Sequence, residues 1–311
     1  MQMKLQYAIM FCLLMGSLCL RSNAQGSVEK PYACSQGNID ELTDRIHEII
    51  KHKRATIGVA VITDKQKLIT VNGDRLFPLL SVFKFPVALA ALDKMDRDHT
   101  NPDSSVFIKN SRLDRDTYSP LLRRYSNRDI RISLAELLYY SISLSDNNAC
   151  DLLIDYIGGM DSVDTYIRNL GVDDIHLSAT ERDMHEDIQL QYKNTGTPIA
   201  AVRLLEMFYQ HSLFEQRYKS LLINALVNTE TGAEKLKGLL PAEAIVAHKT
   251  GSSDRTTEGV KIADNDLGVV FLPDGRKYYI AVFVTESREN DEVNARIIAD
   301  ISYTVYKFFT S

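Results

Sequence analysis

Strand patterns gather near the two ends of this chain of 311 residues, and the long stretch between them is mostly helical in pattern. β-Branched runs over 55–63 and 68–71 predict an early hairpin, because only a short polar turn separates them. Three later runs, over 244–249, 267–272 and 278–285, are β-branched and aromatic and predict the remaining strands. A sheet built from both ends of a chain carries the intervening residues as an insertion. The sequence therefore predicts an α/β (α+β) fold, one sheet domain with an inserted all-helical domain.

Apolar residues spaced three and four apart define the helical segments. Helices are predicted over 38–51, 81–93, 134–140, 149–157, 163–170, 199–211 and 293–309. We expect residues 25–75 plus 227–311 to form the sheet domain, residues 76–226 to form the helical domain, and a functional site to lie between them. The polar, aperiodic segment 178–198 is long for a loop in a compact domain, and loops of that length are usually functional or disordered.

The first 24 residues predict an export signal. Lys4 supplies a positive start, residues 7–20 are apolar and uncharged, and Ser22-Asn23-Ala24 offers small residues before a cleavage site. The apolar run is short for the roughly 20 residues of a membrane-spanning helix, which makes an anchor the weaker alternative. We expect residues 1–24 to be removed and the mature protein to be periplasmic, with no stable insertion in the membrane.

Charge and the scarcity of metal-ligand patterns exclude several classes of partner. The chain carries 36 Lys and Arg against 41 Asp and Glu, and loss of Lys4 and Arg21 with the leader lowers the net charge from −5 by two. Such an acidic protein has no electrostatic reason to bind nucleic acid. The seven His are scattered, so we expect no metal and no cofactor. Cys34 and Cys150 remain after cleavage, and we expect two free thiols, with Cys150 buried.

Ser81 and Lys84 begin the predicted helix that follows Pro78. Positions i and i+3 share a helix face, so the Lys84 amine can reach the Ser81 hydroxyl. A buried lysine with a lowered pKa can accept that proton and make the hydroxyl a nucleophile. A serine at a helix start is also a common N-cap, so this pair alone does not establish catalysis.

Ser145-Asp146-Asn147 precedes another predicted helix. The triplet either makes an ordinary capping turn or has a chemical role. In the second interpretation Ser145 passes a proton to a leaving nitrogen and Asn147 holds a substrate amide.

Lys249-Thr250-Gly251 ends an apolar strand. It is either a simple strand end or a site in which Lys249 and Thr250 bind a carboxylate. Gly251 would then let the substrate backbone lie against the strand edge, since it has no Cβ.

The three patterns Ser-x-x-Lys, Ser-Asp-Asn and Lys-Thr-Gly, in this order, are the signature of class A β-lactamases and penicillin-binding proteins. The sequence resembles that superfamily over nearly the whole mature chain, and Tyr118-Ser119-Pro120 resembles its aromatic position at the mouth of the cleft. The resemblance implies a β-lactamase and transpeptidase-like fold, an antiparallel sheet flanked by N- and C-terminal helices, and a monomer with a small β-lactam substrate. It implies attack by Ser81, with the backbone N–H groups of Ser81 and Ser252 as the oxyanion hole.

Glu181, in the polar segment, separates the two branches of this superfamily. Class A β-lactamases have a Glu there that activates the water for deacylation, whereas penicillin-binding proteins lack it and stay acylated. The resemblance therefore implies a serine β-lactamase that hydrolyses the antibiotic ring and gives resistance, with Glu181 as general base of deacylation. Whether Lys84 or Glu181 takes the first proton stays open. The alternative is a low-molecular-mass penicillin-binding protein, a D,D-peptidase acting on peptidoglycan.

Several positions depart from the common class A pattern. His185 stands where most members have an Asn four residues after the Glu, and we expect it to help hold the same water. Ala179 and Asn194 stand where many members have an Arg–Asp salt bridge, so the loop must be held in another way. These departures resemble the Bacteroides-type cephalosporinase and extended-spectrum branch, which implies a preference for cephalosporins over penicillins.

The residue that supplies a positive charge to the substrate carboxylate also differs from the common class A pattern. Many class A enzymes add an Arg on the strand after Lys-Thr-Gly, and the alignment puts Glu258 there. Lys235 lies in a segment where related enzymes place a substitute Arg. We therefore expect Lys235 to bind the carboxylate together with Lys249, although it lacks the bidentate fork of Arg. Ser252 is expected to add a hydroxyl contact to that carboxylate.

Overall fold

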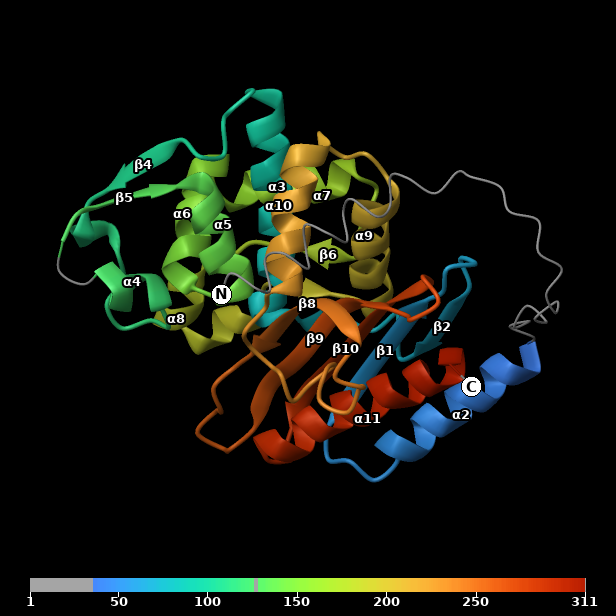
Figure 1. Cartoon of the computed structure of the whole chain (residues 1–311). Coiled ribbons are helices and arrows are strands. Elements are labelled where there is room, and N and C mark those ends of the chain that lie inside the picture. Colours follow the sequence, from blue (N-terminus) through green and yellow to red (C-terminus); the bar gives the residue numbers. More distant parts are fainter. Residues whose placement is uncertain (1–35, 126–127, 311) are drawn as a thin grey trace, which may run out of the picture. The chain divides into compact units, whose positions relative to one another are not determined.

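A five-stranded antiparallel sheet joins the two ends of the chain (Figure 1). Its strands are β1 (Thr56–Ile62), β2 (Leu68–Val71), β8 (Ile245–Ser252), β9 (Lys261–Phe271) and β10 (Lys277–Ser287), in the order β2-β1-β10-β9-β8. β1 pairs with β10 from Thr56 opposite Thr285 to Ile62 opposite Tyr279, so the N-terminal hairpin completes a C-terminal meander. The predicted fold class is confirmed, and every predicted strand is present.

Helices cover both faces of this sheet, and almost every residue of β1, β9 and β10 is therefore buried. Figure 1 shows α11 (Asp291–Thr310) on one face, with α2 (Gln36–Ile50) beside it, and α9 (Pro198–Gln210) on the other. The residues that α11 buries recur at helical spacing from Ala295 to Phe309, as its amphipathic pattern predicted.

The helical region is built around α3 (Lys84–Arg97), whose first nine residues are all buried. A helix that is covered on every side must be apolar all round, and the run from Phe85 to Leu92 is. Its main neighbours are α5 (Leu134–Ser143), α6 (Asn147–Ile157), α7 (Met160–Asn169) and α10 (Gln216–Val227). α10 was not among the individually predicted helices. Four smaller elements of this region were not predicted either: β4 (Ser105–Ile108), η2 (Asn110–Arg112), α4 (Pro120–Tyr125) and β5 (Ile130–Ser133), of which β4 and β5 pair.

The segment 178–198 is not the aperiodic loop that its sequence predicted. It contains α8 (Glu181–Glu186), η3 (Ile188–Tyr192) and β7 (Thr195–Gly196), and β7 joins β3 (Phe77–Pro78) and β6 (Ile175–His176) in a small sheet. α8 begins with a capping box, in which Thr180 accepts from the N–H of Asp183 and Asp183 accepts from the N–H of Thr180. The prediction failed because six residues are too few to show a helical period.

The structure is a computed structural model that describes residues 36–125 and 128–310. Asp40–Ser311 form one compact unit that holds both the sheet and the helices, and the division into two domains at 75 and 227 stays a prediction. The expected signal peptide, residues 1–24, and Cys34 lie outside the described residues. Cys150 is a free, buried thiol as predicted, and burial raises its pKa well above the usual value. No helix in the described part of the chain is long and apolar enough to span a bilayer.

Candidate active site

Ser81 lies in η1 (Leu80–Phe83), a tight turn that runs directly into α3. It does not cap the helix, since no side chain makes a cap hydrogen bond at either helix start. The preceding Leu80 is buried and has φ of 45°, a left-handed conformation that costs a non-glycine residue on the order of 1–3 kcal/mol. Strain of this kind persists only where the surroundings enforce it, and it is common at functional sites.

The strand β8 enforces this turn through Gly251. A Cβ at Gly251 would lie 2.6 Å from the Leu79 carbonyl oxygen and 3.2 Å from the Ser81 nitrogen. From the neighbouring strand β9, Asn265 Nδ2 donates to the carbonyl oxygens of Pro78 and Leu79, at 2.8 and 3.2 Å. Gly251 was predicted to make room for substrate, and the structure gives a nearer reason, the close approach of the segment that carries Ser81.

Lys84 joins the predicted catalytic residues from three parts of the chain. Its Nζ is fully buried and lies 3.0 Å from Ser81 Oγ, 2.8 Å from the Ser145 carbonyl oxygen and 2.6 Å from Asn147 Oδ1. It also forms an ion pair of 2.8 Å with Glu181 Oε1, which in turn lies 3.4 Å from Ser81 Oγ. We call Ser81, Lys84 and Glu181 the Ser81 triad.

Ser145 occupies the turn before α6 and also has a left-handed backbone, with φ of 57°. The buried Asp146 holds that turn. Its carboxylate accepts from the Ala149 N–H as the N-cap of α6, from the Leu121 N–H and from the Ser119 hydroxyl. Burial raises the pKa of Asp146 above its usual value, although these donors oppose the shift. Asp146 is therefore structural and directs the residues on either side of it towards Lys84.

Lys249 lies at the other side of Ser145. Its Nζ is fully buried and donates to Ser145 Oγ at 2.9 Å and to the Thr250 carbonyl oxygen at 2.8 Å. Burial lowers the pKa of Lys249 well below its usual value, and the positive charge of Lys84 acts in the same direction. Among the described residues no carboxylate oxygen lies within 4.0 Å of this amine, so no acid of the protein competes with an incoming anion for it.

Glu181 is held by its backbone as well as by Lys84. It is the first residue of α8 and is 7% exposed. Asp151, on α6, accepts the N–H groups of Glu181 and Arg182 at 2.9 and 3.0 Å and so fixes the start of α8. Burial, followed by the charge of Glu181, raises the pKa of Asp151 to about 7. The sequence analysis did not identify this residue, and a lone Asp inside a helix gave no signal for it.

Asn194 supplies the other support of the segment, which the missing Arg–Asp pair had left open. It is fully buried, and its Oδ1 accepts the N–H groups of Ser178 and Ala179 at 2.9 and 3.0 Å. Its Nδ2 donates to the Ala179 carbonyl oxygen at 2.7 Å. The neutral amide of Asn194 thus joins the two ends of the segment with three hydrogen bonds. It takes the place of the Arg–Asp salt bridge that many class A enzymes have there.

Three predicted substrate-binding residues lie around this cluster. Tyr118 is 50% exposed, with Arg123 over its ring at 5.2 Å, and its carbonyl oxygen accepts the N–H of Asn147. Thr250 Oγ1 lies 2.7 Å from the hydroxyl of Thr231. His185 is exposed on α8, one turn after Glu181 and therefore on the same side of the helix.

Lys235, which was predicted to bind the substrate carboxylate together with Lys249, has partners inside the protein. It is 4% exposed and forms an ion pair of 2.5 Å with Asp264, a buried residue that the sequence analysis did not consider. Its Nζ also donates to Ser252 Oγ at 2.8 Å, and that hydroxyl donates to Asp264 at 2.8 Å. The Ser252 hydroxyl, which was expected to contact a substrate carboxylate, therefore has a donor and an acceptor inside the protein.

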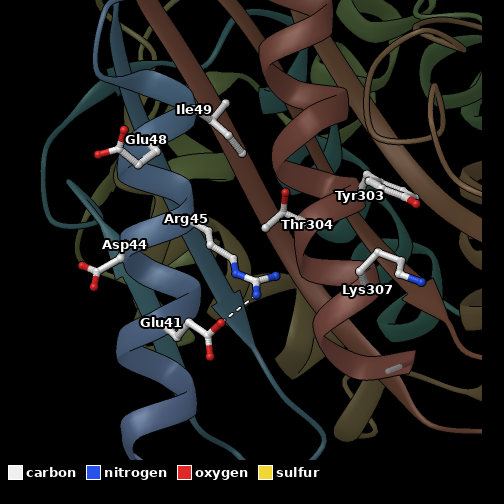
Figure 2. Close-up of a pocket in the computed structure, with 8 residues that line it drawn as sticks. All are labelled: Glu41, Asp44, Arg45, Glu48, Ile49, Tyr303, Thr304 and Lys307. Atoms are coloured by element: carbon white, nitrogen blue, oxygen red, sulfur yellow. Dashed lines mark hydrogen bonds and ion pairs between the residues drawn. The ribbon is translucent and has the colours of Figure 1, made fainter.

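A separate hollow of about 540 Å³ lies between α2 and α11, away from this cluster (Figure 2). Its lining is mostly charged, with Glu41 paired to Arg45 at 2.6 Å, and includes no serine, cysteine or histidine. In the described part of the chain no three His, Cys, Asp or Glu side chains gather as metal ligands. Among the described residues, the predicted nucleophile, the predicted proton acceptors and an amine without a carboxylate partner lie together at the Ser81 triad and its neighbours Ser145 and Lys249.

Comparison with known proteins gives a consistent result. A family model described as the β-lactamase enzyme family matches residues 41–309. A β-lactamase of Bacteroides uniformis is 52% identical over 269 residues, which cover 86% of this chain and 91% of that protein. The extended-spectrum β-lactamase PER-1 of Pseudomonas aeruginosa is 38% identical over 86% of this chain and 87% of its own length.

Solved structures match equally well. A class A β-lactamase from Bacteroides cellulosilyticus superposes with a TM-score of 0.85 and 51% identity, over 88% of this chain and 98% of that one. The extended-spectrum β-lactamase TLA-1 gives a TM-score of 0.86 and 40% identity, over 88% of this chain and all of that one. With the serine, the lysines and the glutamate already assembled, these matches establish that the chain belongs to the β-lactamase enzyme family, as a class A serine β-lactamase that opens β-lactam rings and gives antibiotic resistance.

Proposed function

We propose that the enzyme works through an acyl-enzyme on Ser81. The observation that carries this proposal is the position of the Lys84 amine, in contact with Ser81, Ser145, Asn147 and Glu181 at once. As the oxygen attacks the lactam carbonyl, the hydroxyl proton of Ser81 can pass to Lys84, at 3.0 Å, after the Lys84 ammonium has given one proton to Glu181, or it can pass directly to Glu181, at 3.4 Å. The two routes share the same residues and both remain open.

The developing oxyanion is bound by the backbone N–H groups of Ser81 and Ser252. Ser253 donates its N–H to Ala263 on β9, and N–H groups alternate along a strand, so that of Ser252 faces the open edge of β8. The close approach of Gly251 to the Ser81 nitrogen supports placing both donors at one point. Each such donor contributes roughly 3–4 kcal/mol to transition-state stabilisation.

Ser145 returns the proton to the leaving nitrogen. Its oxygen accepts a hydrogen bond from Lys249, which leaves its own hydrogen free to be donated. Lys249 also binds the substrate carboxylate, with the hydroxyl of Thr250 beside it. Asn147 holds the side-chain amide of the substrate, and Tyr118 lies at the mouth of the site.

Glu181 is the general base of deacylation. Its carboxylate is held near Ser81 Oγ and is exposed enough to contact one water, which it deprotonates for attack on the ester. His185, on the same side of α8, helps to hold that water. Residues 1–24 direct export of the enzyme to the periplasm. There it meets the substrate as the substrate enters the cell.

The test is mass spectrometry of the mature enzyme mixed with benzylpenicillin. Ser81→Ala should show no covalent adduct, and Glu181→Ala should accumulate one, because acylation continues while deacylation stops. Glu186→Ala, which changes an exposed acid on the same helix, should turn over like the unaltered enzyme. Normal turnover by Glu181→Ala would refute the assignment of this base, and an adduct of the unaltered enzyme lasting for hours would favour a penicillin-binding protein.

We also propose a preference for cephalosporins over penicillins and slow turnover of carbapenems. The departures at Ala179 and Asn194 support the first part, because the segment beside the acyl side chain is held by an amide instead of a salt bridge. Leu80 and Ser253 support the second, since they stand near positions where some carbapenem-hydrolysing relatives have a disulfide. Pocket differences of this kind are worth about 1–3 kcal/mol. The ratio of kcat/KM for a first-generation cephalosporin, benzylpenicillin and a carbapenem decides this, and a preference for either of the last two would contradict it.

A further inference from the structure

Beside the proposed oxyanion donors lies a second arrangement of amine, hydroxyl and carboxylate, which we call the Ser252 triad: Ser252, Lys235 and Asp264. Lys235 and Asp264 are 4% and 3% exposed, and their charged groups are 2.5 Å apart. Ser252 is exposed, so the ion pair lies beneath its hydroxyl. Register explains the contact, because Ser252 on β8 lies directly opposite Asp264 on β9.

Every donor of this triad is used inside the protein. Lys235 Nζ has three N–H groups, and its acceptors are Asp264, the Ser252 hydroxyl and the carbonyl oxygens of Asn265 and Gly251, at 3.3 and 3.5 Å. The Ser252 hydroxyl gives its single hydrogen to Asp264 at 2.8 Å. An anion arriving at this edge of β8 therefore meets no free donor from these side chains.

The charges of the triad also cancel. A buried lysine at 2.5 Å from a buried carboxylate attracts a distant anion little, because the carboxylate repels it almost equally. Lys249 is different, since no described carboxylate lies within 4.0 Å of it. Lys249 therefore supplies the attraction for the substrate carboxylate without help from Lys235.

We infer that Asp264 is a specificity-determining residue, which neutralises Lys235 and so limits how strongly the enzyme binds the carboxylate of its substrate. This rests on the proposed function, in which the carboxylate lies against β8 near Lys249. The consequence is unusual for a binding site, because removing an acid that touches no substrate should improve catalysis. The improvement should appear only for substrates that carry the negative charge.

The test compares Asp264→Asn with the double variant Lys235→Met/Asp264→Asn on a cephalosporin and on its carboxylate methyl ester. Asp264→Asn should raise kcat/KM for the free acid by about threefold to tenfold, the scale of one partly screened charge, and should leave the ester unchanged. The double variant restores neutrality and should stay within about threefold of the unaltered enzyme on both substrates. Glu243→Gln removes an equal charge from an exposed side chain and should change neither value.

Three results would overturn the inference: no gain for Asp264→Asn on the free acid, an equal gain on the ester, or a loss of more than about tenfold in the double variant. The last would mean that Lys235 itself binds the carboxylate. If Asp264→Asn fails to fold because it leaves a buried charge unpaired, the double variant decides alone, with thermal unfolding as the check on its fold. Labelling of Ser81 is followed in the same samples, and its absence in the unaltered enzyme would refute the acyl-enzyme and not the role of Asp264.

Discussion

The Ser81 triad and the Ser252 triad contain the same three groups, a hydroxyl, an amine and a carboxylate, yet the reaction is proposed only for the first. In the Ser252 triad the hydroxyl donates at 2.8 Å to its carboxylate, an ordinary hydrogen bond that holds the proton in place. In the Ser81 triad the hydroxyl lies 3.4 Å from its carboxylate, beyond the usual range, so its proton is loosely held. The two clusters therefore differ in hydrogen bonding and not in composition. A hydroxyl whose hydrogen bond is long can give up its proton, whereas a hydroxyl with a short hydrogen bond keeps it.

The backbones of the two regions differ in the same sense. Ser252 and Asp264 are brought together by regular strand pairing, without a left-handed residue in either strand. The Ser81 region has two such residues, Leu80 and Ser145, which lie on either side of Lys84. Strained backbone at the Ser81 triad is typical of a functional site, and relaxed backbone at the Ser252 triad is typical of a structural one.

Replacing the lysine of each triad gives the largest expected contrast. Lys84→Met should lower kcat/KM by roughly 10²–10⁴-fold, since it removes a proton-transfer group and leaves Glu181 without its ion-pair partner. The double variant Lys235→Met/Asp264→Asn should stay within about threefold. Steady-state hydrolysis of one cephalosporin measures both. Similar losses in the two variants would break the distinction between a reactive and a structural triad.

Asp151→Asn tests how the carboxylate of the Ser81 triad is held. Asp151 uses one carboxylate oxygen for each of the two N–H groups at the start of α8, and Asn would turn one of these oxygens into an NH₂ group that faces an N–H, so Glu181 should be displaced and deacylation should slow by about tenfold or more, with acylation little changed. Single-turnover kinetics separate the two steps. Asp155→Asn, an exposed acid one turn later on α6, is the matched control.

Asp151→Asn should also change how the free energy of unfolding depends on pH. The pKa of Asp151 is raised to about 7 in the folded protein, so between roughly pH 4 and 7 the folded state binds more protons than the unfolded state. This contribution to the free energy of unfolding is therefore largest at low pH and falls as the pH rises towards 7. Chemical denaturation across this range should show a weaker decline for Asp151→Asn than for the unaltered enzyme. Identical slopes would mean that Asp151 titrates normally.

Asn194→Ala gives the smallest expected effect, and it is one of stability. Three hydrogen bonds are lost from a fully buried side chain, which should lower the free energy of unfolding by about 1–3 kcal/mol. The Ser252 triad should not respond, so the ratio of kcat/KM for a cephalosporin and its methyl ester should stay constant. Gln189→Ala, at an exposed position in η3, is the control for thermal unfolding. A changed ratio would show that the two regions are coupled.

The sequence by itself determined the parts of this protein that depend on short spacing and on the order of segments. Apolar periodicity was enough for the five strands and the main helices, because burial of one face or of both imposes it. The contact of Ser81 with Lys84 follows from positions three apart on a helical turn. The roles of Ser145, Glu181 and Lys249 came from the resemblance of their motifs to a family, and the structure brings all three within reach of Lys84 or of each other.

Only the tertiary structure decided the contacts between segments that the sequence keeps apart. Asp151 meets Glu181 across 30 residues, and Asn194 meets Ala179 across 15, with no local pattern that marks either residue as a support. Lys235 was predicted from its segment alone to bind the substrate carboxylate, and only the fold reveals its ion pair with Asp264, which lies opposite Ser252 in the strand register. A sequence shows which residues carry charge, but whether a charge is free depends on which other charge the fold buries next to it.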